Sequence, residues 1–229
     1  MIIAGMVKSS LVDYPGLVSC VLFTPGCNYD CFYCHNRSIL DGTHEVLSIG
    51  YIESFLHKRA GLLDAVVISG GEPTLQPDLI PFIREITKSG YKIKLDTNGS
   101  SPSTVKQILD NGLCDYFAVD YKAPAARYEE ICGMGVRAEN VRETIQLLVD
   151  AGLDFEVRTT VIPQLGKEDL IVMSKELPAV PKYVLNLYRL PENYNEYEKP
   201  RVMEKPYSQE KINSFLQLMK EYQPNAVGW

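Results

Sequence analysis

The sequence predicts a single α/β domain built on parallel strands. Short apolar runs rich in β-branched residues alternate with longer amphipathic stretches along most of the chain, which is the pattern of repeated strand–helix units. The 229 residues include 45% hydrophobic and 23% charged residues, enough for one large globular domain. Successive units of this kind imply parallel strands joined by right-handed crossovers.

Each element follows from a local pattern. The expected strands are short and apolar and cover residues 17–24, 64–69, 91–96, 115–120, 155–162 and 182–188. The expected helices carry apolar residues at helical spacing and cover residues 48–60, 77–89, 102–111, 139–151 and 167–176. Three of these helices are followed by a glycine, Gly90, Gly112 or Gly152, which suits a left-handed cap. A short turn is expected at residues 125–131.

The C-terminal part breaks the strand–helix alternation. Residues 1–190 are expected to form the core, and residues 191–229 a loop and a last helix packed on the same domain. Residues 191–206 are polar, bounded by prolines and rich in Tyr and Glu, which is typical of a solvated loop. The pattern leaves two arrangements open, a partial β/α barrel and an open doubly wound sheet. No G-x-G-x-x-G follows the first strand, which weakens a dinucleotide-binding interpretation.

Charge and hydropathy limit the partners. The formal net charge of −6 disfavours nonspecific binding to nucleic acid or to an anionic membrane. No stretch approaches the roughly 18 apolar residues of a membrane span, and the first residues show no signal-peptide pattern. We therefore expect a cytoplasmic protein that binds neither nucleic acid nor membrane.

Three cysteines lie directly after the first expected strand. Cys27, Cys31 and Cys34 have the spacing C-x3-C-x2-C, which in a cytosolic chain indicates metal binding or catalysis rather than disulfides. Three thiolates on one loop would bind three irons of a 4Fe–4S cluster and leave the fourth iron open. The alternative is a structural zinc site with His35 as the fourth ligand. Adjacent Cys34 and His35 would have difficulty converging on one tetrahedral ion.

The other three cysteines are scattered along the chain. Cys20 lies among apolar residues of the first strand and is expected in the core. Cys114 and Cys132 border turns, and we expect neither to be a ligand or a redox group.

Glycines and polar residues stand at or near the ends of four expected strands. They are Gly70, Gly71, Glu72, Asp96, Thr97, Asp120, Lys122 and Arg158. In a parallel β/α assembly these strand ends face one way, where ligands bind. Each motif alone is a weak signal, since a Gly-Gly pair also marks turns. Together with the cysteine loop they predict one functional site.

These motifs resemble a known superfamily. The pattern C-x3-C-x-aromatic-C, with Tyr33 as the aromatic residue, is followed by Gly-Gly-Glu-Pro at residues 70–73, and this combination looks like the radical S-adenosylmethionine superfamily. The resemblance covers about residue 5 to residue 190. It implies a partial (β/α)6 barrel of parallel strands.

A narrower resemblance rests on further stretches. Residues 26–37, the sequence DTNG at residues 96–99 and DYK at residues 120–122 resemble glycyl-radical-enzyme activases. The lead-in SLVDYPG at residues 10–16, with KAP at residues 122–124, is most similar to the branch of anaerobic ribonucleoside-triphosphate reductase activating proteins.

The resemblance implies an oxygen-sensitive iron–sulfur oxidoreductase. Cys27, Cys31 and Cys34 would bind the 4Fe–4S cluster, and the open iron would chelate S-adenosylmethionine. Reductive cleavage would then give a 5′-deoxyadenosyl radical that abstracts hydrogen from a glycine of a partner enzyme. The implied partners are a glycyl radical enzyme, with anaerobic ribonucleotide reductase favoured, and flavodoxin or ferredoxin as electron donor.

The cofactor contacts are also implied by resemblance. They are Tyr33, Gly70, Gly71, Glu72, Asp96, Thr97, Asp120, Lys122 and Arg158. Glu72 is expected at the methionine amino group, Lys122 at the carboxylate, Tyr33 at the adenine and Arg158 in the same cavity. Asp96, Thr97 and Asp120 resemble a monovalent-cation site beside that carboxylate. Two aspartates there would repel it unless a cation or Lys122 intervenes.

The chain also departs from the activases, and alternatives stay open. Some activases place a histidine near the sixth strand, but none stands there in this chain; Asn186 or Tyr188 is expected to replace it. One alternative is a radical S-adenosylmethionine enzyme acting on a small molecule in nucleoside or cofactor synthesis. The other is a zinc-stabilised binding module without catalysis.

Overall fold

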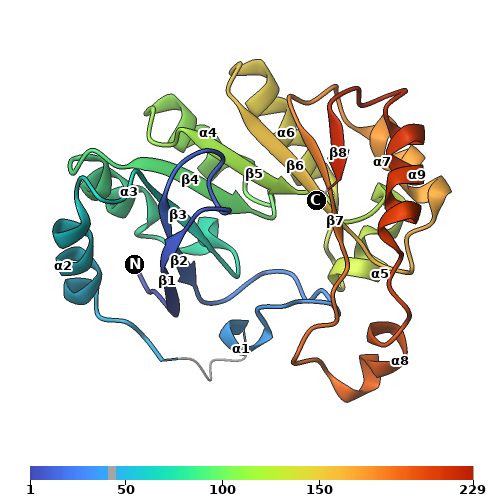
Figure 1. Cartoon of the computed structure of the whole chain (residues 1–229), viewed down its shortest axis with the longest axis horizontal. Helices are drawn as coiled ribbons and strands as arrows, with labels where there is room; N and C mark the ends of the chain where they lie inside the picture. The colour runs from blue at the N-terminus through green and yellow to red at the C-terminus, as the bar shows by residue number, and fades with distance from the viewer. Residues whose placement is uncertain (41–44, 229) are drawn as a thin grey trace. The chain divides into compact units, whose positions relative to one another are not determined.

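The computed structural model describes residues 1–40 and 45–228. Within these residues the strands follow one another in the sheet in chain order, from β1 to β8 (Figure 1). Because the order has two ends, the sheet is open rather than closed into a full barrel. The predicted α/β fold class of the partial-barrel type is confirmed. No helix in the described ranges is both long and apolar enough to cross a membrane.

The bounds of the elements are as follows. The strands are β1 (Gly5–Ser10), β2 (Ser19–Thr24), β3 (Ala65–Gly70), β4 (Lys92–Thr97), β5 (Tyr116–Asp120), β6 (Phe155–Val161), β7 (Tyr183–Leu187) and β8 (Ala226–Gly228). The α-helices are α1 (Arg37–Leu40), α2 (Ile49–Arg59), α3 (Leu79–Thr87), α4 (Pro102–Asp110), α5 (Tyr128–Cys132), α6 (Glu139–Asp150), α7 (Lys167–Glu176), α8 (Lys199–Val202) and α9 (Gln209–Met219). Short 3-10 turns cover Pro73–Leu75, Ala125–Arg127 and Glu196–Glu198.

The six expected strands correspond to β2–β7, and two further strands were not predicted. β1 pairs antiparallel with β2, and β8 pairs parallel with β7. β1 carries polar and exposed residues and β8 has only three residues, so neither has the apolar run that identifies a buried strand. The expected glycine caps are confirmed, because Gly90, Gly112 and Gly152 all have positive φ.

The expectation of a plain solvated loop at residues 191–206 is wrong in part. Residues Lys199–Val202 form α8, and the Val202 side chain is fully buried. Proline at the second position starts this helix without losing a hydrogen bond, because the first amides of a helix have no partner inside it. Composition alone does not reveal such a short buried turn.

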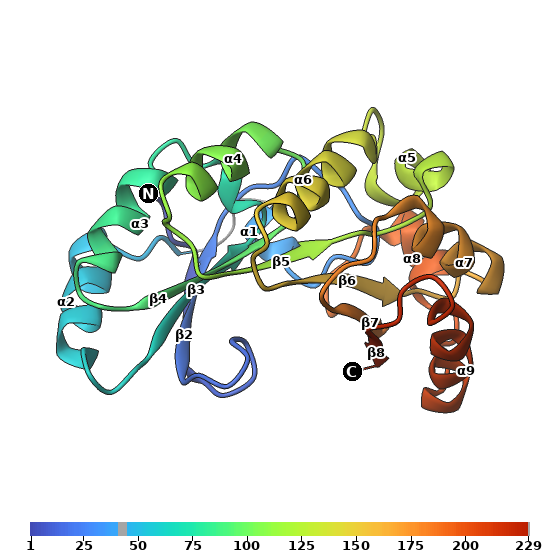
Figure 2. The same cartoon turned by 90° about the horizontal axis from the view of Figure 1, so that it is seen from above.

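Contacts divide the chain into two compact units. Unit 1 comprises Met1–Asn28, Asn36–Thr97 and Ser103–Ala118. Its strands β2, β3 and β4 are parallel and buried, and α3 and α4 lie on one face of β3 and β4 (Figure 2). On β2 and β3, Val21, Ala65 and Val67 form an apolar cluster with Tyr14, which comes from the β1–β2 turn. That turn therefore covers part of the sheet.

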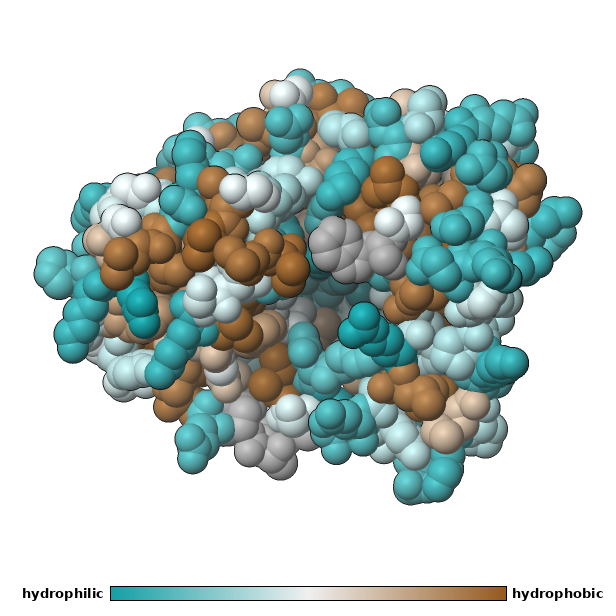
Figure 3. Space-filling model, in the orientation of Figure 1, coloured by the Kyte–Doolittle hydropathy of each residue, from teal (hydrophilic) through white to brown (hydrophobic). Residues whose placement is uncertain are grey.

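The β1–β2 turn also presents apolar side chains to solvent. Leu11 and Val12 are 76% and 67% exposed, and hydrophobic side chains gather over this hairpin in Figure 3. The turn is nevertheless ordered by hydrogen bonds, because the Ser10 hydroxyl accepts from the amides of Val12 and Asp13.

Unit 2 comprises Tyr29–His35, Asn98–Pro102 and Val119–Trp229, of which the structure describes residues up to 228. Its parallel strands β6, β7 and β8 pack with α7 and α9, which lie beside β8 in Figure 1. The buried Gln223 amide donates to the carbonyls of Ser174 and Pro178 and accepts from the amide of Val180. These bonds fix the C-terminal segment on the rest of unit 2.

Candidate functional site

The predicted site residues fall equally into the two units. The unit-1 set consists of Cys27, Gly70, Gly71, Glu72, Asp96 and Thr97, and the unit-2 set consists of Cys31, Tyr33, Cys34, Asp120, Lys122 and Arg158. Most of them lie at the carboxyl ends of strands or directly after them, since β3 ends at Gly70, β4 at Thr97 and β5 at Asp120. This is the edge where ligands of parallel β/α folds bind.

Gly70 and Gly71 are required by the packing of the chain on itself. A Cβ at residue 70 would lie 2.3 Å from the backbone N and O of Thr24, and one at residue 71 would lie 1.9 Å from the Gly26 carbonyl oxygen. Gly70 also has a φ of 124°, which only glycine adopts easily. The amides of Gly71 and Glu72 donate to the carbonyls of Thr24 and Gly26 at 2.8 Å. The resemblance placed these two glycines at the cofactor. The structure shows that their missing side chains also let this turn pack directly against residues 24–26, at the start of the cysteine loop.

Glu72 is buried and its carboxylate is held firmly. Its Oε1 accepts hydrogen bonds from the amide of Thr74 at 3.0 Å, from the Thr74 hydroxyl at 2.6 Å and from the Thr97 hydroxyl at 2.7 Å. The side chain is 0% exposed, and such a carboxylate needs these donors to offset its lost hydration. In unit 1, Thr97 therefore orients Glu72.

Asp96 has an internal cation beside it that sequence reasoning missed. The Lys94 Nζ lies 3.3 Å from Asp96 Oδ1, and the Lys94 side chain is 3% exposed. The Ser69 hydroxyl donates to Asp96 Oδ2 at 3.2 Å. Residues two apart on a strand share a face, so the sequence Lys-x-Asp on β4 carried the signal.

Cys31 and Cys34 lie on one tight turn in unit 2. The Cys34 amide donates to the Cys31 carbonyl at 3.1 Å. The Cys31 thiol is hydrogen-bonded to Cys132, and the Asp30 amide donates to the Cys132 carbonyl at 2.8 Å. Cys132 was expected to be neither a ligand nor a redox group, and its hydrogen bond to Cys31 is a contact that the sequence did not reveal.

The surroundings of Cys31 suit an iron ligand. The hydrogen bond from Cys132 lowers the pKa of the Cys31 thiol, and nearby Lys122 lowers it further, although burial acts in the opposite direction. Iron binds the thiolate form, so this environment fits a cluster ligand. Among residues 1–40 and 45–228, no three His, Cys, Asp or Glu side chains lie together as metal ligands. The ligand assignment therefore rests on the cysteine spacing and on this thiol environment.

Lys122, Asp120 and Arg158 form one charged group. Asp120 lies 3.0 Å from Lys122 Nζ and 3.0 Å from Arg158 Nε. Burial would raise the pKa of Asp120, but Lys122 and Arg158 outweigh it and lower that pKa to about 2. Burial would lower the pKa of Lys122, but the Asp120 carboxylate raises it well above its usual value. Two cations against one carboxylate leave a net positive charge, which suits an anionic group of a ligand.

Tyr33 belongs to an aromatic cluster built around the cysteine turn. Its ring meets Phe32 edge-on at 5.2 Å and Tyr188 edge-on at 6.4 Å. The Tyr188 hydroxyl donates to the Val202 carbonyl at 2.8 Å, so this hydroxyl holds α8. Tyr188, one of the two expected replacements for the histidine, therefore contacts α8 as well as Tyr33.

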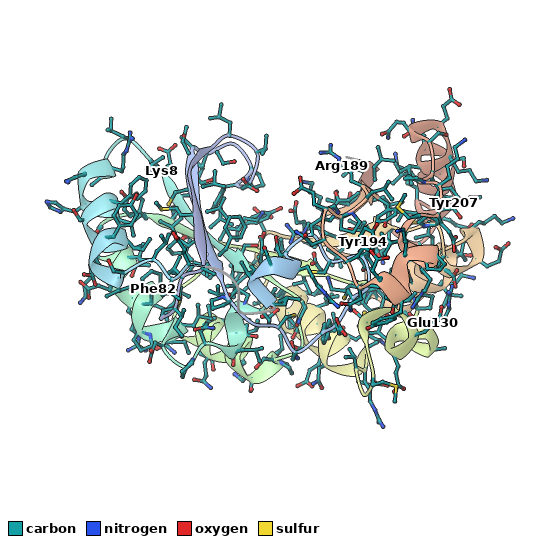
Figure 4. All side chains as sticks on the ribbon, turned by 90° about the horizontal axis from the view of Figure 1, so that it is seen from below. Lys8, Phe82, Glu130, Arg189, Tyr194 and Tyr207 are labelled. Carbon is teal, nitrogen blue, oxygen red and sulfur yellow. The ribbon has the colours of Figure 1, made fainter. Side chains whose placement is uncertain are left out.

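Arg201 of α8 also holds this turn. Its guanidinium carbon lies 4.0 Å from the centre of the Phe32 ring, which is a cation–π distance. Arg201 donates to the Glu130 carbonyl at 3.2 Å and lies 3.4 Å from the Glu198 carboxylate. Figure 4 shows Glu130 beside α8. Arg201 of the C-terminal segment therefore contacts Phe32, which lies between Cys31 and Tyr33 in the sequence.

Comparison with known proteins gives a consistent result. A family model described as "Radical SAM superfamily" matches residues 21–177. A protein of Methanocaldococcus jannaschii named "Putative glycyl-radical enzyme activating enzyme" is 31% identical over 232 residues, covering 99% of this chain and 95% of that protein. A "Probable GTP 3',8-cyclase" of Halobacterium salinarum is 32% identical over 145 residues, covering 58% of this chain and 39% of the cyclase.

A solved structure shares the fold. A domain of pyruvate-formate lyase-activating enzyme from Bacteroides vulgatus superposes with a TM-score of 0.55 at 19% identity, covering 72% of this chain and 98% of that domain. At this identity the likeness shows the fold alone.

Proposed function

The chain belongs to the radical SAM superfamily, and from this premise we propose that it is an activase that forms a glycyl radical on a partner enzyme. The observation that carries the proposal is the similarity to the M. jannaschii protein, which extends over nearly the full length of both chains. A match of this extent includes the C-terminal segment as well as the core.

The cofactors of the superfamily are a 4Fe–4S cluster and S-adenosylmethionine. When bound, they supply a 5′-deoxyadenosyl radical, with methionine as the other product. We assign Cys27, Cys31 and Cys34 to the cluster, which leaves one iron open to the cofactor. Cys132 and Lys122 support this role by favouring the thiolate of Cys31.

The chain's own residues would bind and orient S-adenosylmethionine. We assign Glu72 to the methionine amino group, because its carboxylate is fixed by Thr74 and Thr97. The net positive charge of Lys122 and Arg158 against Asp120 suits the carboxylate. Gly70, Gly71, Asp96, Thr97 and Tyr33 complete the proposed set. Of these, Gly71 keeps the turn next to Cys27 free of side chains.

The proposed partner is anaerobic ribonucleotide reductase. The lead-in at residues 10–16 supports this choice over other glycyl radical enzymes, and in unit 1 it forms the ordered turn with exposed Leu11 and Val12. Flavodoxin or ferredoxin is the proposed electron donor. We place the reaction in the cytoplasm, in keeping with six cysteines that are all free thiols in the structure.

The test is an anaerobic incubation of the reconstituted protein with S-adenosylmethionine, a reductant and a candidate anaerobic ribonucleotide reductase. The expected result is a glycyl-radical doublet in the electron paramagnetic resonance spectrum, together with 5′-deoxyadenosine, only when every component is present. A reductase whose radical glycine is replaced by alanine is the matched control and should remove the doublet. No doublet, from a protein that retains its cluster, would contradict the proposal for that partner.

A second candidate is a radical S-adenosylmethionine enzyme acting on a small molecule. The similarity to the cyclase of H. salinarum favours it, although this chain spans only 39% of that protein. In the same incubation, formation of 5′-deoxyadenosine without a glycyl radical would favour this candidate. Formation of 5′-deoxyadenosine that rises on addition of GTP would identify its substrate class.

A further inference from the structure

Lys94 is a buried cation placed among acceptors rather than in solvent. Its Nζ lies 3.3 Å from Asp96 Oδ1 and donates to the Asp13 carbonyl at 2.6 Å. It also lies 5.8 Å from the centre of the Tyr116 ring. A carboxylate, a carbonyl and an aromatic face are the groups that stabilise a desolvated cation.

The fold places this ammonium group where it is. In the register of β3 and β4, Lys94 is opposite Val67, and Val67 is opposite Val21 on β2. Val21 and Val67 belong to the apolar cluster that Tyr14 of the β1–β2 turn covers. An apolar side chain would therefore suit position 94. A buried lysine there is stable only because Asp96 and the turn provide its partners.

We infer that the Lys94 ammonium group takes the place of a bound monovalent cation beside Asp96. As a consequence, S-adenosylmethionine binding does not depend on Na⁺ or K⁺. This inference rests on the cofactor site of the proposed function and changes one expectation drawn from the sequence. Asp96, Thr97 and Asp120 were expected to form a cation site. The structure gives each of these groups a protein partner: Lys94 for Asp96, Glu72 for Thr97, and Lys122 with Arg158 for Asp120.

An ammonium group differs from a bound ion in one respect that matters here. It is covalently fixed, so its charge is present at any salt composition and carries no binding equilibrium of its own. Within unit 1, Lys94 compensates the charge of Asp96, and within unit 2, Lys122 and Arg158 compensate that of Asp120. Lys94 is a positioning residue in this scheme, since it acts through Asp96. It also ties the β1–β2 turn, at Asp13, to that same aspartate.

The first measurement uses the wild-type protein and needs no variant. The affinity of the cluster-loaded protein for S-adenosylmethionine is measured by anaerobic equilibrium dialysis in potassium chloride, sodium chloride and tetramethylammonium chloride at equal ionic strength. The affinity is expected to agree within about twofold in the three salts. The melting temperature of the cluster-free protein is expected to be equal in them as well. A loss of about tenfold or more in tetramethylammonium chloride would overturn the inference.

The second measurement uses Lys94→Met, which keeps an unbranched side chain one atom shorter and removes the charge. In tetramethylammonium chloride this variant is expected to bind S-adenosylmethionine at least about tenfold more weakly than wild type, because Asp96 is left as an uncompensated charge. Potassium or sodium should recover part of the loss. Wild-type affinity in tetramethylammonium chloride, or a variant affinity that is the same in all three salts, would overturn the inference.

Lys92→Met is the matched control. Lys92 lies two residues earlier on the same strand, but it is 60% exposed and pairs with Asp115. Its loss should leave the affinity and the salt response unchanged. The partner enzyme takes no part in these measurements. A missing glycyl radical in the activase test would therefore contradict the proposed function and leave this inference standing.

Discussion

The unit-1 and unit-2 sets are held by different forces. In unit 1, Gly70, Gly71 and Glu72 are fixed by backbone contacts too close for a side chain and by neutral hydroxyl donors. In unit 2, Lys122, Asp120 and Arg158 are fixed by opposite charges at 3.0 Å. The difference teaches that shape defines the Gly70–Gly71 turn of unit 1, whereas charge defines the Lys122–Asp120–Arg158 group of unit 2 and the Lys94–Asp96 pair of unit 1. Changes of volume should damage the Gly70–Gly71 turn, and changes of charge or pH should affect the Lys122–Asp120–Arg158 group.

The largest expected effect is the loss of a cluster thiol in unit 2. We expect Cys31→Ala to abolish cluster binding, because three thiolates are the minimum for a cluster with one open iron. Iron and sulfide per chain after anaerobic reconstitution measure this. Cys114→Ser is the control, since burial raises the pKa of Cys114 to about 12 and keeps it a thiol. Cys132→Ser keeps a donor beside Cys31 and should retain the cluster. Equal iron loss in all three variants would refute the division of the cysteines.

A steric change tests the claim that shape defines the Gly70–Gly71 turn of unit 1. Gly71→Ala places a methyl group 1.9 Å from the Gly26 carbonyl oxygen, and we expect the free energy of unfolding to fall by about 1–3 kcal/mol. Denaturant unfolding of the cluster-free protein measures it. The control is Gly50→Ala in α2, where nothing lies within 4 Å of the added carbon. A stable Gly71→Ala protein would show that the turn can move away from the cysteine loop.

Glu72→Gln keeps the volume and removes the charge. We expect the affinity for S-adenosylmethionine to fall about tenfold or more, the loss of one charged hydrogen bond, while iron content stays at the wild-type level. Equilibrium dialysis and iron analysis measure the two quantities. Asp64→Asn, a carboxylate that binds the Val18 amide just before β3, is the control. Unchanged affinity in Glu72→Gln would remove the role assigned to this residue.

The Arg201–Phe32 contact tests how firmly unit 2 holds its cysteine turn. We expect Arg201→Gln to speed iron release to a chelator several-fold, because a cation–π contact is worth about 0.5–2 kcal/mol. Arg201→Lys keeps the cation and should recover part of the effect. Lys199→Gln on the same helix removes a lysine that pairs with exposed Glu196, and this variant should release iron at the wild-type rate. Equal rates in all four proteins would show that α8 plays no part.

The smallest expected effect is a pH dependence of stability from Asp120. Because Lys122 and Arg158 lower its pKa to about 2, its contribution is complete above the usual value of about 4. The contribution is then lost as the pH falls toward 2. The difference in denaturation midpoint between wild type and Asp120→Asn should therefore shrink between pH 6 and pH 3. Asp110→Asn, at an exposed pair with Lys106, should differ little from wild type at either pH. A constant difference for Asp120→Asn would contradict the assigned cause.

The sequence by itself determined the features that depend on local order. The strands β2–β7, the main helices and the glycine caps follow from periodicity and from backbone preferences, which act over a few residues. The C-x3-C-x2-C spacing and the motifs at the strand ends are equally local, and the parallel topology places them on one edge of each unit. For this reason the fold class and the candidate residues could be predicted before any coordinates.

Only the tertiary structure decided which groups from distant parts of the chain meet. Lys94 lies beside Asp13, Cys132 beside Cys31, and Arg201 over Phe32, and the last two pairs join segments roughly 100 residues or more apart. The same holds for Gly71 against Gly26. Periodicity carries no information about such contacts, because they depend on how separate elements pack and on which buried charges find a partner there. The sequence thus determined the candidate groups, and packing decided which of them hold the others in place.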